Sequence, residues 1–223
     1  MQEDKRIRII TGHYGSGKTE FAVNYTIKLS EEGKKVAIAD MDIVNPYFRS
    51  REKKAYMEKL GIRVVAPLEG AANADIPALP AEIYALMQDS SYDVVLDVGG
   101  DAVGAKALGR YFDYLSRGGY DMLIVVNANR PNTGSPESVV RYIEEIERAA
   151  RIPATGLINN THMLRETTLD DVLRGQEVVE EVSRVKNLPV KYISAVESVA
   201  AQIPKGLQGE VFPIKMYMRP EWL

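Results

Sequence analysis

The feature that most constrains this chain is a glycine-rich segment close to its start. Residues 12–19 read Gly-His-Tyr-Gly-Ser-Gly-Lys-Thr, which has the spacing of a phosphate-binding P-loop. The segment follows a short apolar run at residues 6–11 and leads into a stretch with helical character. It therefore stands between a predicted strand and a predicted helix, the context in which a P-loop works. This combination predicts that the chain binds a nucleotide.

The chemistry of a P-loop explains these residue types. Glycines let the backbone approach phosphate oxygens closely, and successive N–H groups at a helix start hold the anion. We expect the catalytic ammonium of Lys18 on the β- and γ-phosphates and the hydroxyl of Thr19 on Mg²⁺. The predicted nucleotide-binding residues are Gly12, His13, Tyr14, Gly15, Ser16, Gly17, Lys18, Thr19 and Glu20.

Composition argues against several other classes of protein. The 223 residues carry a net charge of −3 at pH 7, so bulk charge gives no reason to expect nucleic-acid binding. The chain has no cysteine and only two histidines, which excludes cysteine-ligated metal centres and disfavours histidine clusters. No apolar run approaches the ~18 residues of a membrane span, and the start does not read as a signal peptide. We therefore expect a cytoplasmic protein that binds neither nucleic acid nor membrane.

Short β-rich runs alternate with longer helical patterns along the whole chain. We predict strands near residues 6–11, 35–39, 62–66, 93–97, 121–127, 154–159 and 190–194. Their continuous apolar character suits strands that are buried on both faces of a parallel sheet. Ser135 and Thr168 open two segments with apolar residues at helical spacing.

This alternation predicts one α/β domain over residues 1–223. We expect a doubly wound, mostly parallel sheet of about seven strands flanked by helices, as in P-loop NTPases. The tail at about 204–223, which contains three prolines and the lone tryptophan, is expected to pack on the surface.

Carboxylates follow two of the predicted strands, at the sheet edge where ligands of such folds bind. Asp40 and Asp42 would lie on the same side of an extended strand, where a carboxylate could hold a magnesium water or orient an attacking water. The alternative is that both aspartates shape a turn before a helix around Tyr47. Asp97 ends an apolar strand in the Walker B manner, which supports Mg²⁺.

Residues 97–101 add a second feature to that strand end. Asp97-x-x-Gly100 is similar to segments that sense a γ-phosphate, in which the glycine N–H contacts the phosphate and moves away on its release. Asp101 is expected to cap the following helix rather than to take part in catalysis.

Two later strand ends are rich in asparagine. An asparagine amide can read an adenine edge, but it can equally satisfy loop backbone. For Asn127 and Asn129 we favour the loop role, and for the pair Asn159 and Asn160 we favour contact with the base.

As an ordered set, these motifs resemble the MinD/ParA-like P-loop ATPases, the CobQ/CobB/MinD/ParA group of nucleotide-binding domains. The resemblance spans nearly the whole chain and rests on the P-loop, Asp40-x-Asp42, Asp97-x-x-Gly100 and Asn159-Asn160. It implies ATP and Mg²⁺ as ligands and a nucleotide-dependent homodimer. It also implies that Asp42 positions the attacking water near the metal, that Asp97 is an outer-sphere magnesium ligand and that Asn160 contacts adenine.

One position departs from that family. The residue after the first glycine is there a lysine that reaches across the dimer to the partner's nucleotide, and here it is His13. Histidine is shorter and mostly neutral at pH 7, so it does not replace that charge. Arg49, Arg51 and Arg130 are the candidates for supplying it.

The same comparison bears on the base. Related maturation GTPases carry Asn-Lys-x-Asp after this strand, and the aspartate accepts the guanine N–H groups. Residues 159–162 here are Asn-Asn-Thr-His, so ATP is favoured over GTP.

The leading hypothesis is a Mg²⁺-dependent ATP-binding protein, a slow ATPase that acts as a nucleotide switch for a protein partner. ATP would order the segments around residues 40–49 and 97–104. Three alternatives stay open: a small-molecule kinase or ATP-dependent ligase on a related fold, a non-hydrolysing regulatory subunit that binds nucleotide, and a GTPase metallochaperone.

Overall fold

One parallel sheet organises the computed structural model, which describes residues 4–42, 50–66, 81–117 and 119–219. In this described part the strand order is β3-β2-β4-β1-β5-β6-β7-β8, and every pairing is parallel. The strands are β1 (Ile7–Thr11), β2 (Val36–Met41), β3 (Arg63–Val65), β4 (Asp93–Val98), β5 (Tyr120–Val126), β6 (Gly156–Asn159), β7 (Val190–Val196) and β8 (Glu210–Ile214). The predicted fold class and all seven predicted strands are confirmed, and β8 is added.

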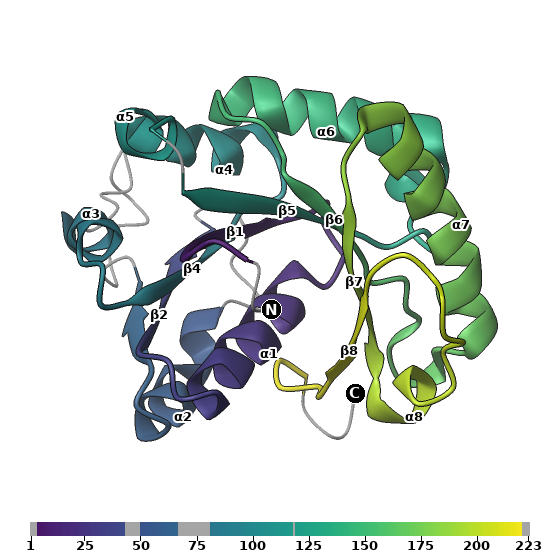
Figure 1. Cartoon of the computed structure of the whole chain (residues 1–223), viewed down its shortest axis with the longest axis horizontal. Coiled ribbons are helices and arrows are strands. Elements are labelled where there is room, and N and C mark those ends of the chain that lie inside the picture. The colour runs from purple at the N-terminus through teal and green to yellow at the C-terminus, as the bar shows by residue number, and fades with distance from the viewer. Residues whose placement is uncertain (1–3, 43–49, 67–80, 118, 220–223) are drawn as a thin grey trace.

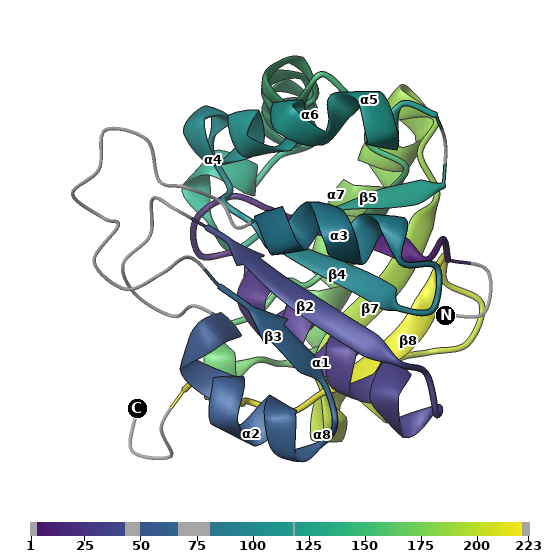
Figure 2. The same cartoon turned by 90° about the vertical axis from the view of Figure 1, so that its left-hand side faces the viewer.

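Helices cover both faces of the sheet (Figures 1 and 2). The helices are α1 (Lys18–Glu31), α2 (Lys54–Lys59), α3 (Ala81–Gln88), α4 (Ala102–Lys106), α5 (Phe112–Leu115), α6 (Pro136–Ala150), α7 (Leu169–Lys186) and α8 (Glu197–Ala200). Helices α1 and α2 bury their apolar residues against one face, and α3 to α7 bury theirs against the other. This is the doubly wound arrangement that the alternating pattern predicted.

The two longest helices begin where the sequence indicated. Ser135 caps α6 and Thr168 caps α7, and each takes part in a capping box. Val139 and Ile143 of α6 and Val179 of α7 are fully buried, as their spacing predicted. The packing of α6 and α7 onto β5 and β6 fixes the strand ends that face the P-loop.

The sequence predicts that the C-terminal segment packs on the surface, but in the structure part of it joins the sheet. Residues 210–214 form β8, the edge strand beside β7. Phe212 and Ile214 are buried, and the ring of Phe212 lies 5.1 Å from the ring of Phe21 in α1. Pro213 obscures this strand in the sequence, because proline lacks an N–H and is confined to strands that are paired on one side only.

Within the described residues, no helix combines the length and the apolar character that a membrane crossing would need.

Gly175 permits the close approach of α7 to the segment that follows β6. A Cβ at this position would lie 2.0 Å from Oγ1 and 2.4 Å from Cβ of Thr161. We expect Gly175→Ala to lower the free energy of unfolding by roughly 1–3 kcal/mol, as overpacking does. Chemical denaturation measures this. Gly109→Ala is the matched control, because its Cβ would meet no atom within 4 Å, and equal midpoints for the two variants would contradict the expectation.

Candidate functional site

The P-loop lies at the centre of the sheet edge where the strands end. Strand β1 lies between β4 and β5, and the chain leaves β1 through residues 12–17 into α1. Crossovers run in opposite directions from this point, which is where ligands bind in open α/β sheets. Gly17 directly precedes α1 with φ of 80°, a left-handed conformation that glycine adopts without strain. The P-loop therefore connects β1 to the first turn of α1, as the sequence predicted.

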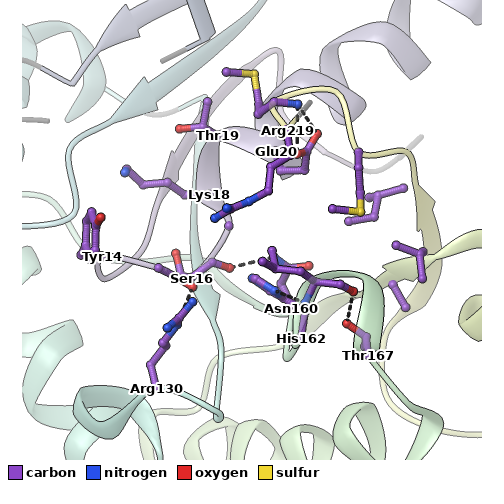
Figure 3. A pocket seen from close by; sticks show the side chains of 18 of the residues that line it. Tyr14, Ser16, Lys18, Thr19, Glu20, Arg130, Asn160, His162, Thr167 and Arg219 are labelled. Atoms are coloured by element: carbon purple, nitrogen blue, oxygen red, sulfur yellow. Dashed lines mark hydrogen bonds between the residues drawn. The ribbon is translucent and has the colours of Figure 1, made fainter. Parts of the chain in front are cut away.

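Side chains from the segments that follow β5 and β6 bond to the P-loop (Figure 3). Asn160 donates through Nδ2 to the carbonyl oxygen of Ser16 at 2.7 Å. Asn127 and Arg130 both donate to the carbonyl oxygen of Gly15, each at 3.2 Å. These bonds occupy the carbonyl groups of Gly15 and Ser16, so residues far along the chain help to set the shape of the P-loop.

Lys18 forms a buried ion pair at the start of α1. Its Nζ lies 3.0 Å from Oδ2 of Asp42, and both side chains are buried. Burial lowers the pKa of Lys18, but the carboxylates of Asp97 and Asp42 more than offset this and raise the pKa above its ordinary value. Lys18 is therefore cationic, and Asp42 is its ion-pair partner.

Asp40 has a different position in the same turn. One of its oxygens accepts the backbone N–H of Asp42 at 3.1 Å. This contact matches the turn-shaping alternative for Asp40, while Asp42 faces Lys18. The helix predicted around Tyr47 lies outside the described residues.

Asp97 is fully buried at the end of β4, beside the P-loop. Thr19 donates through Oγ1 to its Oδ1 at 3.4 Å, and within the described residues Oδ2 has no hydrogen-bond partner. Burial raises the pKa of Asp97 to about 7; the Lys18 ammonium opposes this rise, and Asp40 and Asp42 add to it.

These residues fit a magnesium ion that is bound together with phosphate. A buried carboxylate oxygen without a partner stands beside the hydroxyl of Thr19, and both are oxygen ligands of the kind Mg²⁺ takes. No trio of histidine, cysteine or carboxylate side chains among the described residues forms a metal cage. Phosphate oxygens and water would therefore supply the remaining ligands, as is usual for Mg²⁺.

The segment after β4 rests directly on the P-loop. A Cβ at Gly100 would lie 1.9 Å from the carbonyl oxygen of Gly12, so the two backbones touch. Thr11 donates through Oγ1 to the carbonyl oxygen of Gly99 at 3.3 Å. Asp101 caps α4 by accepting the N–H of Gly104 at 2.7 Å, as predicted. The segment with the Asp-x-x-Gly pattern is thus placed where it contacts the phosphate cradle.

His13 makes its contacts within its own chain. Its Nε2 lies 3.2 Å from Nδ2 of Asn132, and its Nδ1 lies 3.3 Å from the carbonyl oxygen of Tyr14. In this arrangement Nε2 accepts from the Asn132 amide and Nδ1 donates to the Tyr14 carbonyl. The ring also meets the edge of Tyr142, with centroids 5.6 Å apart.

Of the three arginines considered as replacements for the missing lysine, Arg130 lies at the P-loop. Its guanidinium bonds to the Gly15 carbonyl and lines the adjoining pocket. Arg49 and the side chain of Arg51 lie outside the described residues.

A pocket extends from the P-loop along the ends of β6, β7 and β8 (Figure 3). The P-loop and the start of α1 form one side, and the loop after β6 forms another. The remaining lining comes from the strand ends and the tail: Ala195, Val196, Ile214, Met216, Met218 and Arg219. A largely apolar space next to a phosphate cradle has the character of a nucleoside site.

The two asparagines predicted to contact the base have different surroundings in the structure. Asn160 lines the pocket, and its Oδ1 is buried without a hydrogen-bond partner in the described part of the chain. Asn159 does not line it, since its Nδ2 donates to the carbonyl of Val172 and to Oε1 of Gln176, both at 3.0 Å. Asn159 therefore joins β6 to α7.

His162 is a pocket residue that the sequence did not single out. Its Nδ1 accepts the N–H of Leu164 at 3.3 Å, which places the ring proton on Nε2. That Nε2 is buried without an acceptor among the described residues. Burial lowers the pKa of His162 to about 4, and the positive charge of Arg130 adds to this, so the ring is neutral at pH 7.

The tail residues of the pocket were also missed, and so was the role of Glu20. Glu20 lines the pocket, but its carboxylate accepts the backbone N–H groups of Tyr217 and Met218. Backbone contacts of this kind leave no sequence motif, so only the prediction of β8 could have drawn attention to them.

No family model matches this chain, and no curated protein sequence matches it. Solved structures do match in fold. The Thermotoga maritima cell division protein ftsY aligns over 86% of this chain at 22% identity with a TM-score of 0.59. The signal recognition particle receptor FtsY from Elizabethkingia anophelis, solved in complex with GDP, aligns over 88% at 20% identity and 0.57. The chloroplast FtsY from Physcomitrella patens aligns over 83% at 21% identity and 0.57.

These likenesses show the fold, which is that of a P-loop NTPase. Their identities are too low to transfer an activity. The chain also spans only part of those structures, covering 62%, 59% and 56% of their respective lengths.

Asp97 should make the stability of the ligand-free protein depend on pH. The pKa of Asp97 is raised in the folded state from an ordinary 3.8 to about 7. The contribution of this group to folding stability is therefore full below about pH 4 and is lost as pH rises through about 7. Asp97→Asn cannot ionise and should gain stability relative to wild type by up to about 1.4 kcal/mol for each pH unit in that window. Denaturant titrations without Mg²⁺ at pH 5, 6 and 7 measure this gap. A gap that is constant across the three pH values would show that Asp97 does not titrate there.

Proposed function

We propose that this chain is a Mg²⁺-dependent ATP-binding protein of the MinD/ParA-like type, and that it works as a nucleotide switch for a protein partner with slow hydrolysis. The observation that carries the proposal is the buried pair of Lys18 and Asp42 beside a P-loop whose carbonyl groups accept hydrogen bonds from Asn127 and Asn160. A P-loop whose backbone is fixed by neighbouring side chains, with the Lys18 ammonium beside it, suits the phosphates of a nucleotide.

The chain's own residues suggest how binding and cleavage would proceed. Phosphate oxygens compete with Asp42 for the ammonium of Lys18, because both are anions at the same cation. Once Lys18 turns to the phosphates, the carboxylate of Asp42 becomes available to orient water. Thr19 and Asp97 would hold Mg²⁺, which neutralises charge on the phosphates when it is bound.

A switch needs a segment that responds to the γ-phosphate. Gly100 touches Gly12 of the P-loop, and Asp42 comes from the neighbouring strand end, so two segments meet at this side of the cradle. A phosphate at this point would favour one arrangement of both segments over another. A protein partner that contacts them would then distinguish the two nucleotide states, and so would a second copy of the chain.

The pocket supports adenine over guanine. Among the described lining residues Glu20 is the only carboxylate, and backbone N–H groups already occupy it. The buried Oδ1 of Asn160 is an acceptor, because Nδ2 of the same amide is fixed on the Ser16 carbonyl. Adenine offers an amino donor where guanine offers a carbonyl oxygen. The FtsY structure that holds GDP shows why this preference needs a direct test.

His13 favours a second candidate, a regulatory subunit that binds nucleotide without hydrolysing it. Its ring lies beside Asn132 and Tyr14, and histidine does not supply the charge of the family's lysine. Arg130 is the described residue best placed to supply charge in its stead. Tight ATP binding with no measurable phosphate release would decide for this candidate.

Lys18→Ala should weaken ATP binding by at least about tenfold, a change of ~1.4 kcal/mol, because it removes the cation at the phosphate site. Calorimetry with Mg²⁺ measures ATP and GTP affinity, and a phosphate-release assay measures turnover. The matched control is Lys28→Ala, an exposed lysine on the same helix, which should bind like wild type.

Wild type should also bind ATP at least about tenfold more tightly than GTP. A preference for GTP would overturn the adenine assignment. Failure of wild type to bind either nucleotide would overturn the proposed function. Size-exclusion chromatography and pull-downs with ADP or a non-hydrolysable ATP analogue then show whether ATP recruits a second copy or another protein.

A further inference from the structure

The first turns of α1 hold the residues that follow β8. Glu20 accepts the N–H of Tyr217 at 2.6 Å and the N–H of Met218 at 3.1 Å. Asn24, one turn further along, donates to the carbonyl oxygen of Lys215 and accepts its N–H, both at 2.8 Å. Two side chains of the P-loop helix therefore bind the backbone of one short segment, residues 215–218, which we call the strap.

The strap is held from its outer side as well. The ring of Tyr217 packs against the ring of Tyr56 in α2, with centroids 5.7 Å apart. Asn24 and Met218 are both largely buried. Burial of the Glu20 carboxylate raises its pKa, and the two backbone N–H groups act in the opposite direction. Burying a carboxylate costs free energy of desolvation, and hydrogen bonds from the backbone N–H groups of the strap offset that cost.

The strap carries side chains into the pocket. Met216 and Met218 line it together with Ile214, the last residue of β8. Methionine is flexible and polarisable, and it packs well on flat aromatic groups. The phosphate cradle, by contrast, is fixed by Asn127, Arg130 and Asn160 and needs no part of the strap.

We propose that Glu20 and Asn24 are positioning residues for the nucleoside. They fix the strap to α1, and the strap presents the apolar wall against which the nucleoside half of the ligand packs. This inference rests on the proposed nucleotide-binding function. It assigns the two ends of the ligand to separate supports: the loop and Lys18 hold the phosphates, and the strap holds the nucleoside.

The separation gives the inference a signature that a general loss of structure would not produce. Inorganic tripolyphosphate has the phosphates of ATP and no nucleoside, so it needs the cradle but not the strap. Loosening the strap should weaken ATP and leave tripolyphosphate unchanged. Damage to α1 itself would weaken both, because α1 also carries Lys18 and Thr19.

The experiment measures calorimetric affinities of the full chain for ATP and for tripolyphosphate, each with Mg²⁺. Glu20→Ala and Asn24→Ala should each weaken ATP by at least about tenfold, which corresponds to ~1.4 kcal/mol. Tripolyphosphate affinity should change by less than about twofold, since the bonds that fix the cradle remain. Glu31→Ala is the matched control, because Glu31 is exposed on the same helix and lies outside both supports.

Met218→Ala removes part of the apolar wall without changing a residue of α1. It allows the same comparison of ATP and tripolyphosphate affinity if Glu20→Ala does not fold. It should show the same selective loss of ATP binding. Equal weakening of ATP and tripolyphosphate in these variants, or no weakening of either, would overturn the inference while the wild type still binds both. A wild type that binds neither ligand would instead overturn the proposed function, and this inference with it.

Discussion

The site depends on one buried ammonium among three buried carboxylates. Lys18 lies at the start of α1 with Asp40, Asp42 and Asp97 around it, and all four side chains are shielded from water. Charges in such surroundings interact strongly, so the group as a whole favours additional positive charge. The raised pKa of Asp97 is one expression of this imbalance, because a bound proton removes one negative charge. A divalent cation would remove more. An excess of buried negative charge of this kind suits Mg²⁺ accompanied by phosphate.

The sheet brings this cluster together, and this part of the architecture could be predicted from sequence. β2 and β4 are neighbours, and their parallel register places Asp40 opposite Asp97. Apolar runs that end in a carboxylate, with a helix after each, leave few other arrangements. The same reasoning predicted Asp101 as the cap of the helix that became α4, and it placed Asn160 at the sheet edge where ligands bind, although not its bond to the Ser16 carbonyl. Each of these residues acts where a strand or a helix ends, which is where sequence patterns are most informative.

The nucleoside side of the pocket could not be predicted in this way. β8 contains Pro213 and is short, so its alternation of buried and exposed residues did not stand out. Glu20 and Asn24 bind backbone atoms of the strap, and a backbone partner has no residue identity for a motif to record. Asn159 shows the converse limit: its amide could have served a base or the fold, and only the position of Gln176 in α7 decides for the fold. Motifs therefore support a prediction of the phosphate site, whereas long-range contacts form the rest of the pocket.

The contacts of α1 with the strap also bear on how the pocket is assembled during synthesis. They join residues that are 191 to 198 positions apart in the chain. The P-loop and α1 form from residues that are neighbours in the chain, whereas contacts between residues far apart in sequence form late in folding. A chain synthesised from its N-terminus acquires such contacts last. A nascent chain that has passed β6 would possess a phosphate cradle without a complete nucleoside pocket. Under the proposed role of the strap, the protein would hold the whole nucleotide only after this segment has been synthesised and has docked, and full affinity would then indicate a chain that is folded through residue 218.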